Sequence, residues 1–379
     1  MFFEHFFYNF DKTTKIVTFL QIFRLNSIVM EQKKYKNGFV LGKFLPLHLG
    51  HMLLITSAAR DCENLTVLAC SLKNEPIPGN LRYRWVKSFC DSYQGNCKIK
   101  VINMTEELPQ LPEEHPDFWN IWCDVIKRSS PDGLDVIFSS EDYGFELAKR
   151  LDIKHELVDK ERIKQPISGT VIRNNPFANW QYIYHKAKPY FMKRIYFLGP
   201  ESTGKSTTSK LLADKFDVNW VPEYGRFLYE EKNGELEFMD FCEIVIKQRD
   251  IENKLISNSQ KPFIMCDTEV ITSKVFCELY YPEEFHKLDE FFDFNIKKQI
   301  ENNCHFFIMH PDITEAVQDG TRKFIDYQAR VKHYDMIVRE LIKLDVSCTV
   351  LTGEHQQRIE TVEEFIKNSN FNIQPQIND

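Results

Sequence analysis

The stretch that decides the fold is Gly199-Pro200-Glu201-Ser202-Thr203-Gly204-Lys205-Ser206, which fits the pattern GxxxxGK[ST]. It follows an apolar run at 194–198, predicted as a strand, and precedes an amphipathic run at 205–216, predicted as a helix. A loop in this position wraps a polyphosphate with inward-pointing backbone N–H groups, and the following helix adds its positive end. A plain helix-capping turn is the alternative interpretation, but the complete pattern and its context favour a phosphate cradle.

The cradle predicts ATP as co-substrate and Mg²⁺ as cofactor. Lys205 is a point charge suited to the terminal phosphates, and the Ser206 hydroxyl is suited to ligate the metal. The residues expected to bind the nucleotide are Gly199, Glu201, Ser202, Thr203, Gly204, Lys205, Ser206 and Thr207.

Short apolar runs alternate with amphipathic segments along the rest of the chain. We predict strands at 38–41, 65–70, 98–102 and 134–138, and helices at 51–60, 82–92, 118–128 and 145–150. The second half adds strands at 263–266, 306–309 and 347–351, with long helices at 238–256 and 324–344. The fold class is therefore α/β, with two doubly wound parallel-sheet domains.

The expected domains are an N-terminal extension at 1–36, a first domain at 37–190 and a second domain at 191–379, because Pro189 breaks a helical pattern just before a new strand. The 379 residues suit two domains of ordinary size. The stretch 1–29 carries five phenylalanines in its first ten residues and no motif. It is either an upstream translation artefact, with Met30 as the start, or a poorly ordered extension.

Composition excludes several classes of protein. A net charge of −7 argues against a nucleic-acid binder, so any anionic ligand must be held by local cations. The most apolar stretch, 17–30, is broken by polar residues and predicts neither a membrane span nor a signal peptide. Ten cysteines without a CxxC pair predict neither a disulfide framework nor a zinc site, and they suit the cytoplasm.

A second candidate site lies between the first strand and the first helix, where the chain reads Gly42-Lys43-Phe44-Leu45-Pro46-Leu47-His48-Leu49-Gly50-His51. Two histidines flank a glycine at the carboxyl end of a parallel strand, which is where open α/β sheets bind ligands. Their ring N–H groups could donate to triphosphate oxygens, although a histidine pair is more often structural. Gly42, Lys43 and Phe44 belong to the same expected site.

A third element is Ile167-Ser168-Gly169-Thr170-Val171-Ile172-Arg173. The spacing Ser168-x-Thr170-x-x-Arg173 indicates a capped helix start with a cation one turn in. It is either plain capping or a second phosphate clamp that stabilises the charge on departing pyrophosphate.

Together these residues resemble the nucleotidyltransferase superfamily, whose hallmarks are GxFxPxHxGH and a later ISxTxxR segment. The tail at 173–180, RNNPFANW, resembles a bacterial bifunctional family that joins nicotinamide-mononucleotide adenylyltransferase to ribosylnicotinamide kinase. Val221–Arg226, Cys266–Glu269 and Asp319–Arg322 resemble that family's substrate-side and lid segments. Enterobacterial relatives also carry an N-terminal repressor domain, and the 36 residues before the first strand are too few for it.

The resemblance implies a Rossmann-like nucleotidyltransferase followed by a P-loop kinase. In the kinase half, Lys205 would hold phosphates and Arg322 would stabilise the transferring group from a lid. Asp267 and Glu223 compete for the role of general base, and Arg226 would contact substrate. A helix N-cap is the alternative role for Asp267.

In the first half, the resemblance implies positioning and charge stabilisation by His48, His51, Lys43 and Arg173. Weaker expectations for substrate contact fall on Glu141, Tyr143 and Trp180. The expected partners are ATP, nicotinamide riboside, nicotinamide mononucleotide and a second copy of the chain. Two alternatives stay open, namely an adenylyltransferase for another phosphorylated acceptor fused to a kinase, and an NAD-sensing regulator with residual catalysis.

Overall fold

The computed structural model describes residues 33–301, 303–312 and 326–369. Met30 and the expected extension up to residue 32 lie outside these ranges, as do the predicted lid at 319–322 and Arg322 within it. Within the described ranges, no helix has both the length and the apolar character that a membrane crossing requires.

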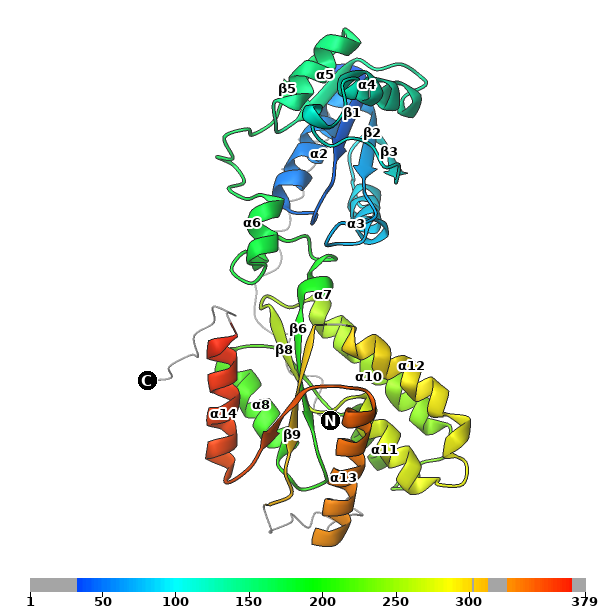
Figure 1. Cartoon of the computed structure of the whole chain (residues 1–379), viewed down its shortest axis with the longest axis vertical. Helices are drawn as coiled ribbons and strands as arrows, with labels where there is room; N and C mark the ends of the chain where they lie inside the picture. The colour runs from blue at the N-terminus through cyan, green and yellow to red at the C-terminus, as the bar shows by residue number, and fades with distance from the viewer. Residues whose placement is uncertain (1–32, 302, 313–325, 370–379) are drawn as a thin grey trace, which may run out of the picture.

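The first of two parallel sheets has the strand order β3-β2-β1-β4-β5 (Figure 1). Its strands are β1 (Tyr35–Gly42), β2 (Cys62–Cys70), β3 (Lys98–Met104), β4 (Val136–Ser139) and β5 (Lys154–Leu157). Its helices are α2 (Leu49–Asp61), α3 (Gly79–Asp91), α4 (Phe118–Ser129), α5 (Tyr143–Leu151) and α6 (Gly169–Asn174).

The second sheet has the order β10-β9-β6-β8-β7 and is also parallel. Its strands are β6 (Lys193–Leu198), β7 (Trp220–Val221), β8 (Phe263–Cys266), β9 (Cys304–Met309) and β10 (Cys348–Leu351). Its helices are α8 (Lys205–Phe216), α9 (Tyr224–Glu231), α10 (Asp240–Ser257), α11 (Val270–Tyr280), α12 (Asp289–Ile300), α13 (Tyr327–Lys343) and α14 (His355–Asn368). The predicted fold class, two α/β domains with doubly wound parallel sheets, is confirmed.

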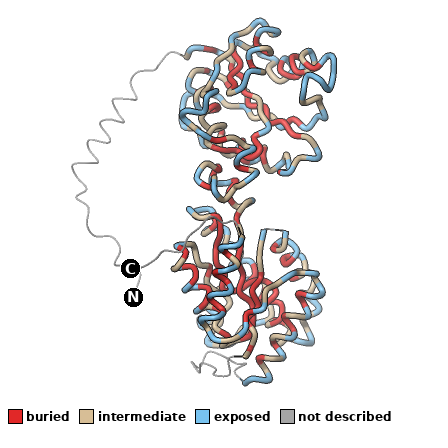
Figure 2. The backbone as a smooth tube through the Cα atoms, turned by 60° about the vertical axis from the view of Figure 1, so that its left-hand side comes forward, coloured by how far each residue is buried: buried red, intermediate tan, exposed pale blue. Residues whose placement is uncertain are grey.

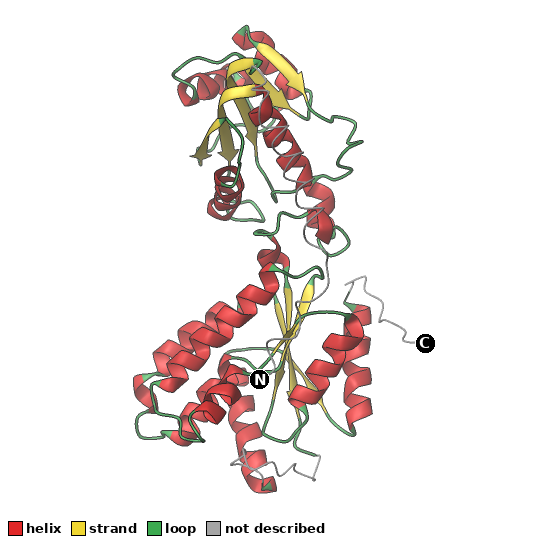
Figure 3. Cartoon of the chain, turned by 180° about the vertical axis from the view of Figure 1, so that it is seen from behind, coloured by secondary structure: helices red, strands yellow, loops and turns green. Residues whose placement is uncertain are grey.

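Helices cover both faces of each sheet, so the central strands are buried on both sides (Figures 2 and 3). Alternate residues of β1 therefore pack in opposite directions. Phe39 packs with α4 and α5, and Val40 packs in the cluster that includes α2 and α3. In the second sheet, Phe197 packs in the cluster of α8 and α14, and Tyr196 faces the other helical layer.

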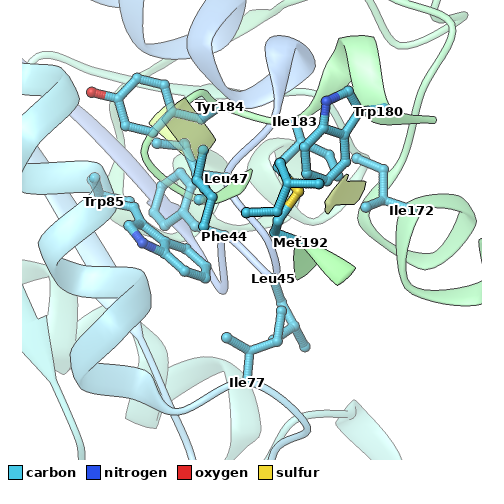
Figure 4. Close-up of a cluster of buried hydrophobic side chains, with 14 of the residues drawn as sticks. Phe44, Leu45, Leu47, Ile77, Trp85, Ile172, Trp180, Ile183, Tyr184 and Met192 are labelled. Carbon is cyan, nitrogen blue, oxygen red and sulfur yellow. The ribbon is translucent and has the colours of Figure 1, made fainter. Parts of the chain in front are cut away.

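The chain passes from the first sheet to the second through the short helix α7 (Lys188–Phe191). Trp180, Ile183 and Met192 gather beside Phe44 in a buried apolar cluster at this junction (Figure 4). The boundary after residue 190 falls inside α7 and stays a proposal.

Both candidate sites lie where the strand order reverses. In each sheet the first strand, β1 or β6, has neighbours reached by crossovers in opposite directions. The loops after these two strands hold the histidine pair and the phosphate cradle, so the fold places both at the carboxyl edge where a crevice opens.

Candidate functional site

The first candidate site is a cleft of about 790 Å³ at the carboxyl edge of the first sheet. It brings together nearly all the residues that the sequence singled out in this half. Those that line it are Gly42, Lys43, Phe44, His48, His51, Glu141, Tyr143, Ser168, Thr170 and Arg173.

The two histidines form a neutral, stacked pair. Their ring centroids are 3.8 Å apart, and the Gly50 backbone N–H donates to His48 Nδ1 at 3.1 Å. A neutral His48 therefore carries its proton on Nε2, where it is a donor. Burial lowers the pKa of His48 to about 2 and that of His51 to about 4, so both rings are hydrogen-bond donors without charge at neutral pH.

The positive charge of this cleft comes instead from lysine and arginine. Lys43 Nζ lies 3.0 Å from a carboxylate oxygen of Glu75, which also pairs with the buried Arg82. Arg173 donates to the Leu45 carbonyl at 2.6 Å and to Thr170 Oγ1 at 3.1 Å. These contacts hold the charged groups of both side chains in place in the cleft, beside the loop that carries the histidines.

The helix α6 packs directly against that loop. Ser168 caps α6 by accepting from the Val171 backbone N–H, as its spacing predicted. A Cβ added at Gly169 would lie 2.5 Å from the Leu45 carbonyl oxygen, so only glycine permits this approach. The two segments that the sequence paired as motifs are therefore in contact.

Of the residues that the sequence predicted less strongly for this cleft, some line it and one does not. Tyr143 lines the cleft, but its hydroxyl donates to the Leu41 carbonyl at 3.1 Å, which fixes the ring. Trp180 does not line the cleft. Its ring is 3% exposed within the junction cluster of Figure 4, and its Nε1–H donates to the Ser259 carbonyl at 3.4 Å. The structure thus places Trp180 in the core, where its large apolar ring packs, rather than against substrate.

The second candidate site is a cleft of about 240 Å³ over the phosphate cradle. Gly199 and Gly204 adopt positive φ angles of 139° and 85°, and a Cβ at Gly199 would lie 2.8 Å from the Met309 carbonyl oxygen. Lys205 is 9% exposed, and its Nζ donates to the carbonyls of Gly199 and Pro200 at 2.8 and 2.9 Å. The ammonium is therefore held across its own loop by two backbone carbonyls.

Arg358 on α14 supports the cradle from behind. Its guanidinium is fully buried and donates to the carbonyls of Thr203 and His310, both at 3.0 Å, and pairs with Asp312. This side chain ties the loop to the ends of β9 and β10, and no sequence motif marks it.

Asp267 lies at the end of β8 beside the cradle. Burial raises the pKa of its carboxyl, while hydrogen bonds from Ser206 and Ser209 oppose that shift. Its Oδ1 atom is buried without a hydrogen-bond partner in the described part of the chain. A hydroxyl and a carboxylate in contact are oxygen ligands of the kind that Mg²⁺ uses together with substrate phosphates, so these residues fit the metal.

Glu223 precedes α9 and lines the cleft together with Arg226. Burial, with a further contribution from the charge of Asp267, raises the pKa of its carboxyl to about 7, although Lys205 opposes the shift. A carboxyl with a pKa near 7 in a cleft is suited to proton transfer at neutral pH.

The far wall of this cleft is apolar and was missed by the sequence reasoning. It consists of Tyr229, Leu236, Phe241, Ile244, Phe276 and Tyr280, with Thr272 and Ser273 as polar groups. These residues lie on α9, α10, α11 and the loop after α9 at spacings that also describe an ordinary helix core, so the sequence held no signal to separate them. Trp119, Trp122 and Arg162 are comparable additions to the first cleft.

The fold and the two clefts define a class: a nucleotide-binding α/β protein with a P-loop domain following a separate sheet. In agreement, the family described as "AAA domain" matches residues 194–358.

Two of the relatives found by sequence comparison are described as trifunctional NAD biosynthesis/regulator protein NadR. The protein of Salmonella typhimurium (strain LT2) is 30% identical over 335 residues, which cover 82% of this chain and 77% of that protein. The protein of Escherichia coli (strain K12) is 28% identical, over 84% of this chain and 79% of its own length. The chain belongs to the NadR family.

Two solved structures share the fold. One is a NadR protein in complex with NAD and AMP-PNP, and the other a NadR protein in complex with NR. Each has a TM-score of 0.74 at 21% identity and aligns with 92% of this chain and 100% of its own chain.

Proposed function

We propose that this chain is a bifunctional enzyme of NAD biosynthesis. Its second domain would phosphorylate nicotinamide riboside with ATP, and its first domain would join the resulting mononucleotide to the AMP part of a second ATP. The observation that carries the proposal is the pair of separate clefts, each lined by a glycine-containing loop that follows the first strand of its own sheet. The names of the relatives, and the NAD and NR in the two similar structures, support these substrates.

In the kinase cleft, the 5′-hydroxyl oxygen of the riboside would attack the γ-phosphorus while the bond to ADP breaks. Lys205 would exchange its two carbonyl partners for phosphate oxygens. Ser206 and Asp267 would hold Mg²⁺, which supplies charge neutralisation at the phosphates when bound. Glu223 would accept the hydroxyl proton, and the aromatic wall would receive the pyridine ring.

In the transferase cleft, a phosphate oxygen of the mononucleotide would attack the α-phosphorus, and pyrophosphate would leave. No covalent enzyme intermediate is required. The neutral rings of His48 and His51 would donate hydrogen bonds to the triphosphate, and Lys43 and Arg173 would stabilise the charge that develops on the leaving group.

The direct test supplies nicotinamide riboside and Mg-ATP to the full chain and identifies the products by chromatography. We expect nicotinamide mononucleotide first, then NAD and pyrophosphate. A panel containing pantetheine phosphate and flavin mononucleotide addresses the other acceptors, and adenylation of one of them in preference to nicotinamide mononucleotide would overturn the assignment. Nucleotide binding without any turnover would favour a regulator.

A further inference from the structure

The loop between β5 and α6, residues 158–168, brings to the transferase cleft a cation that no motif marks. Arg162 lines this cleft together with the histidine pair. The loop is closed by its own backbone: the Arg162 N–H donates to the Asp159 carbonyl at 2.8 Å, and the N–H groups of Lys164 and Gln165 donate to the Asp159 carboxylate at 3.0 and 2.9 Å. Its shape therefore does not depend on the Arg162 side chain.

Arg162, His48 and His51 line the same cleft, and the charge of Arg162 contributes to lowering the pKa of each ring. Because the rings are neutral, the side chains of this cleft that bring positive charge to a bound polyphosphate are arginine and lysine. Lys43 is paired with Glu75 at 3.0 Å, and Arg173 is anchored to the Leu45 carbonyl at 2.6 Å.

The ion pair that holds Arg162 is much looser. Its guanidinium nitrogen lies 3.9 Å from a carboxylate oxygen of Glu141, and the two side chains are 45% and 64% exposed. An exposed pair of this kind contributes little to stability, whereas a hydrogen bond between guanidinium and phosphate is charge-assisted and often bidentate. A phosphate group is therefore a more favourable partner for the Arg162 guanidinium than the Glu141 carboxylate is.

We propose that Arg162 leaves Glu141 and binds a phosphate oxygen of the transferase substrates, next to His48 and His51. This inference rests on the proposed function of the first cleft. The phosphate belongs to ATP or to the mononucleotide, and the two sources are distinguished by measurement.

The variants are Arg162→Gln, which removes the positive charge, and Arg162→Lys, which keeps the charge but lacks the planar guanidinium that can make two parallel hydrogen bonds. The matched control is Lys160→Gln, because Lys160 lies on the same loop, pairs with Asp142 at 2.6 Å, and is absent from the cleft lining. We expect Arg162→Gln to raise the KM for one substrate about 10- to 100-fold, as loss of a charge-assisted contact does. Arg162→Lys should recover part of this loss, and Lys160→Gln and every variant's kinase activity should match the parent.

The substrate whose KM rises identifies the phosphate. Calorimetric titration with inorganic triphosphate and with nicotinamide mononucleotide, in chains that also carry Lys205→Ala to weaken phosphate binding in the other cleft, provides a readout independent of turnover. A parent chain that makes no NAD would contradict the proposed function, while these titrations would still test Arg162. The inference is wrong if neither ligand binds more weakly to Arg162→Gln, or if Lys160→Gln loses as much as Arg162→Gln does.

Discussion

Glu223 gives the most direct test of the kinase chemistry, because the pKa of its carboxyl is raised to about 7, mainly by burial. A general base must be deprotonated, so the kinase rate should be full well above pH 7 and fall as the pH decreases through that value. From pH 8 to pH 6, the deprotonated fraction of such a group falls from about nine-tenths to about one-tenth. The expected loss in kcat/KM is therefore about tenfold over these two pH units.

Glu223→Gln should remove this pH limb and lower the rate about 10²- to 10⁴-fold, the usual contribution of a general base. Initial rates of riboside phosphorylation from pH 5.5 to 8.5, at saturating Mg²⁺, measure both effects. Glu231→Gln is the matched control, since Glu231 lies exposed at the end of α9, the helix that Glu223 precedes, and does not line the cleft. If Glu223→Gln kept the limb near pH 7 and lost less than about tenfold in rate, the proton would have to go elsewhere, with Asp267 as the next candidate.

Three further substitutions test the division of labour between the clefts. Lys205→Ala should lower the rate of riboside phosphorylation by about 10²–10³-fold while still making NAD from supplied mononucleotide. His51→Ala should keep riboside phosphorylation and lower the rate of NAD formation by a similar factor. Loss of both activities in either folded variant would require a shared ATP site. Gly169→Ala would place a Cβ 2.5 Å from the Leu45 carbonyl oxygen, so it should displace α6 from the histidine loop and lower transferase kcat/KM with the kinase unchanged. Unchanged transferase kinetics would show that this contact does not position the site.

The two motif-bearing loops, and the fold around them, could be predicted because their chemistry constrains the sequence. A loop that must approach a phosphate needs glycine at fixed places, and it needs a strand before it and a helix after it. The structure places the cradle between β6 and α8 and the histidines between β1 and α2, as predicted. The buried central strands were equally clear, because strands covered on both faces are continuous apolar runs.

Two of the four edge strands were missed for the opposite reason. The strand β5, with the sequence KHEL, and β7, with only two residues, lie at the edges of their sheets and carry polar or few residues. The helix α11 begins Val-Ile-Thr and follows β8 closely, so local propensity did not favour it. Tertiary packing decides these elements.

The same distinction applies to the candidate site. Residues within motifs were located from their spacing, whereas Arg162, Arg358 and the aromatic wall come from segments without a motif and are brought to the clefts only by folding. Trp180 shows the converse, because an aromatic residue near a motif was given a ligand role and belongs to the core.

Under the proposed function, the two clefts would hold anions by different means, although the whole chain carries a net charge of −7. In the kinase cleft the central cation, Lys205, is 9% exposed and little screened by solvent. In the transferase cleft the histidines are uncharged, and Arg162, the cation inferred to move, is 45% exposed. Salt screens exposed charges over about 8–10 Å at physiological ionic strength, and it screens buried charges much less.

Raising KCl from 50 to 500 mM should therefore increase the KM for ATP of the transferase reaction by a larger factor than the KM for ATP of the kinase reaction, with both measured on one preparation. In Arg162→Gln, the salt-induced increase in the transferase KM should become closer to that of the kinase KM. If the difference between the two reactions stayed the same, the salt dependence would be assigned to Lys43 and Arg173 instead.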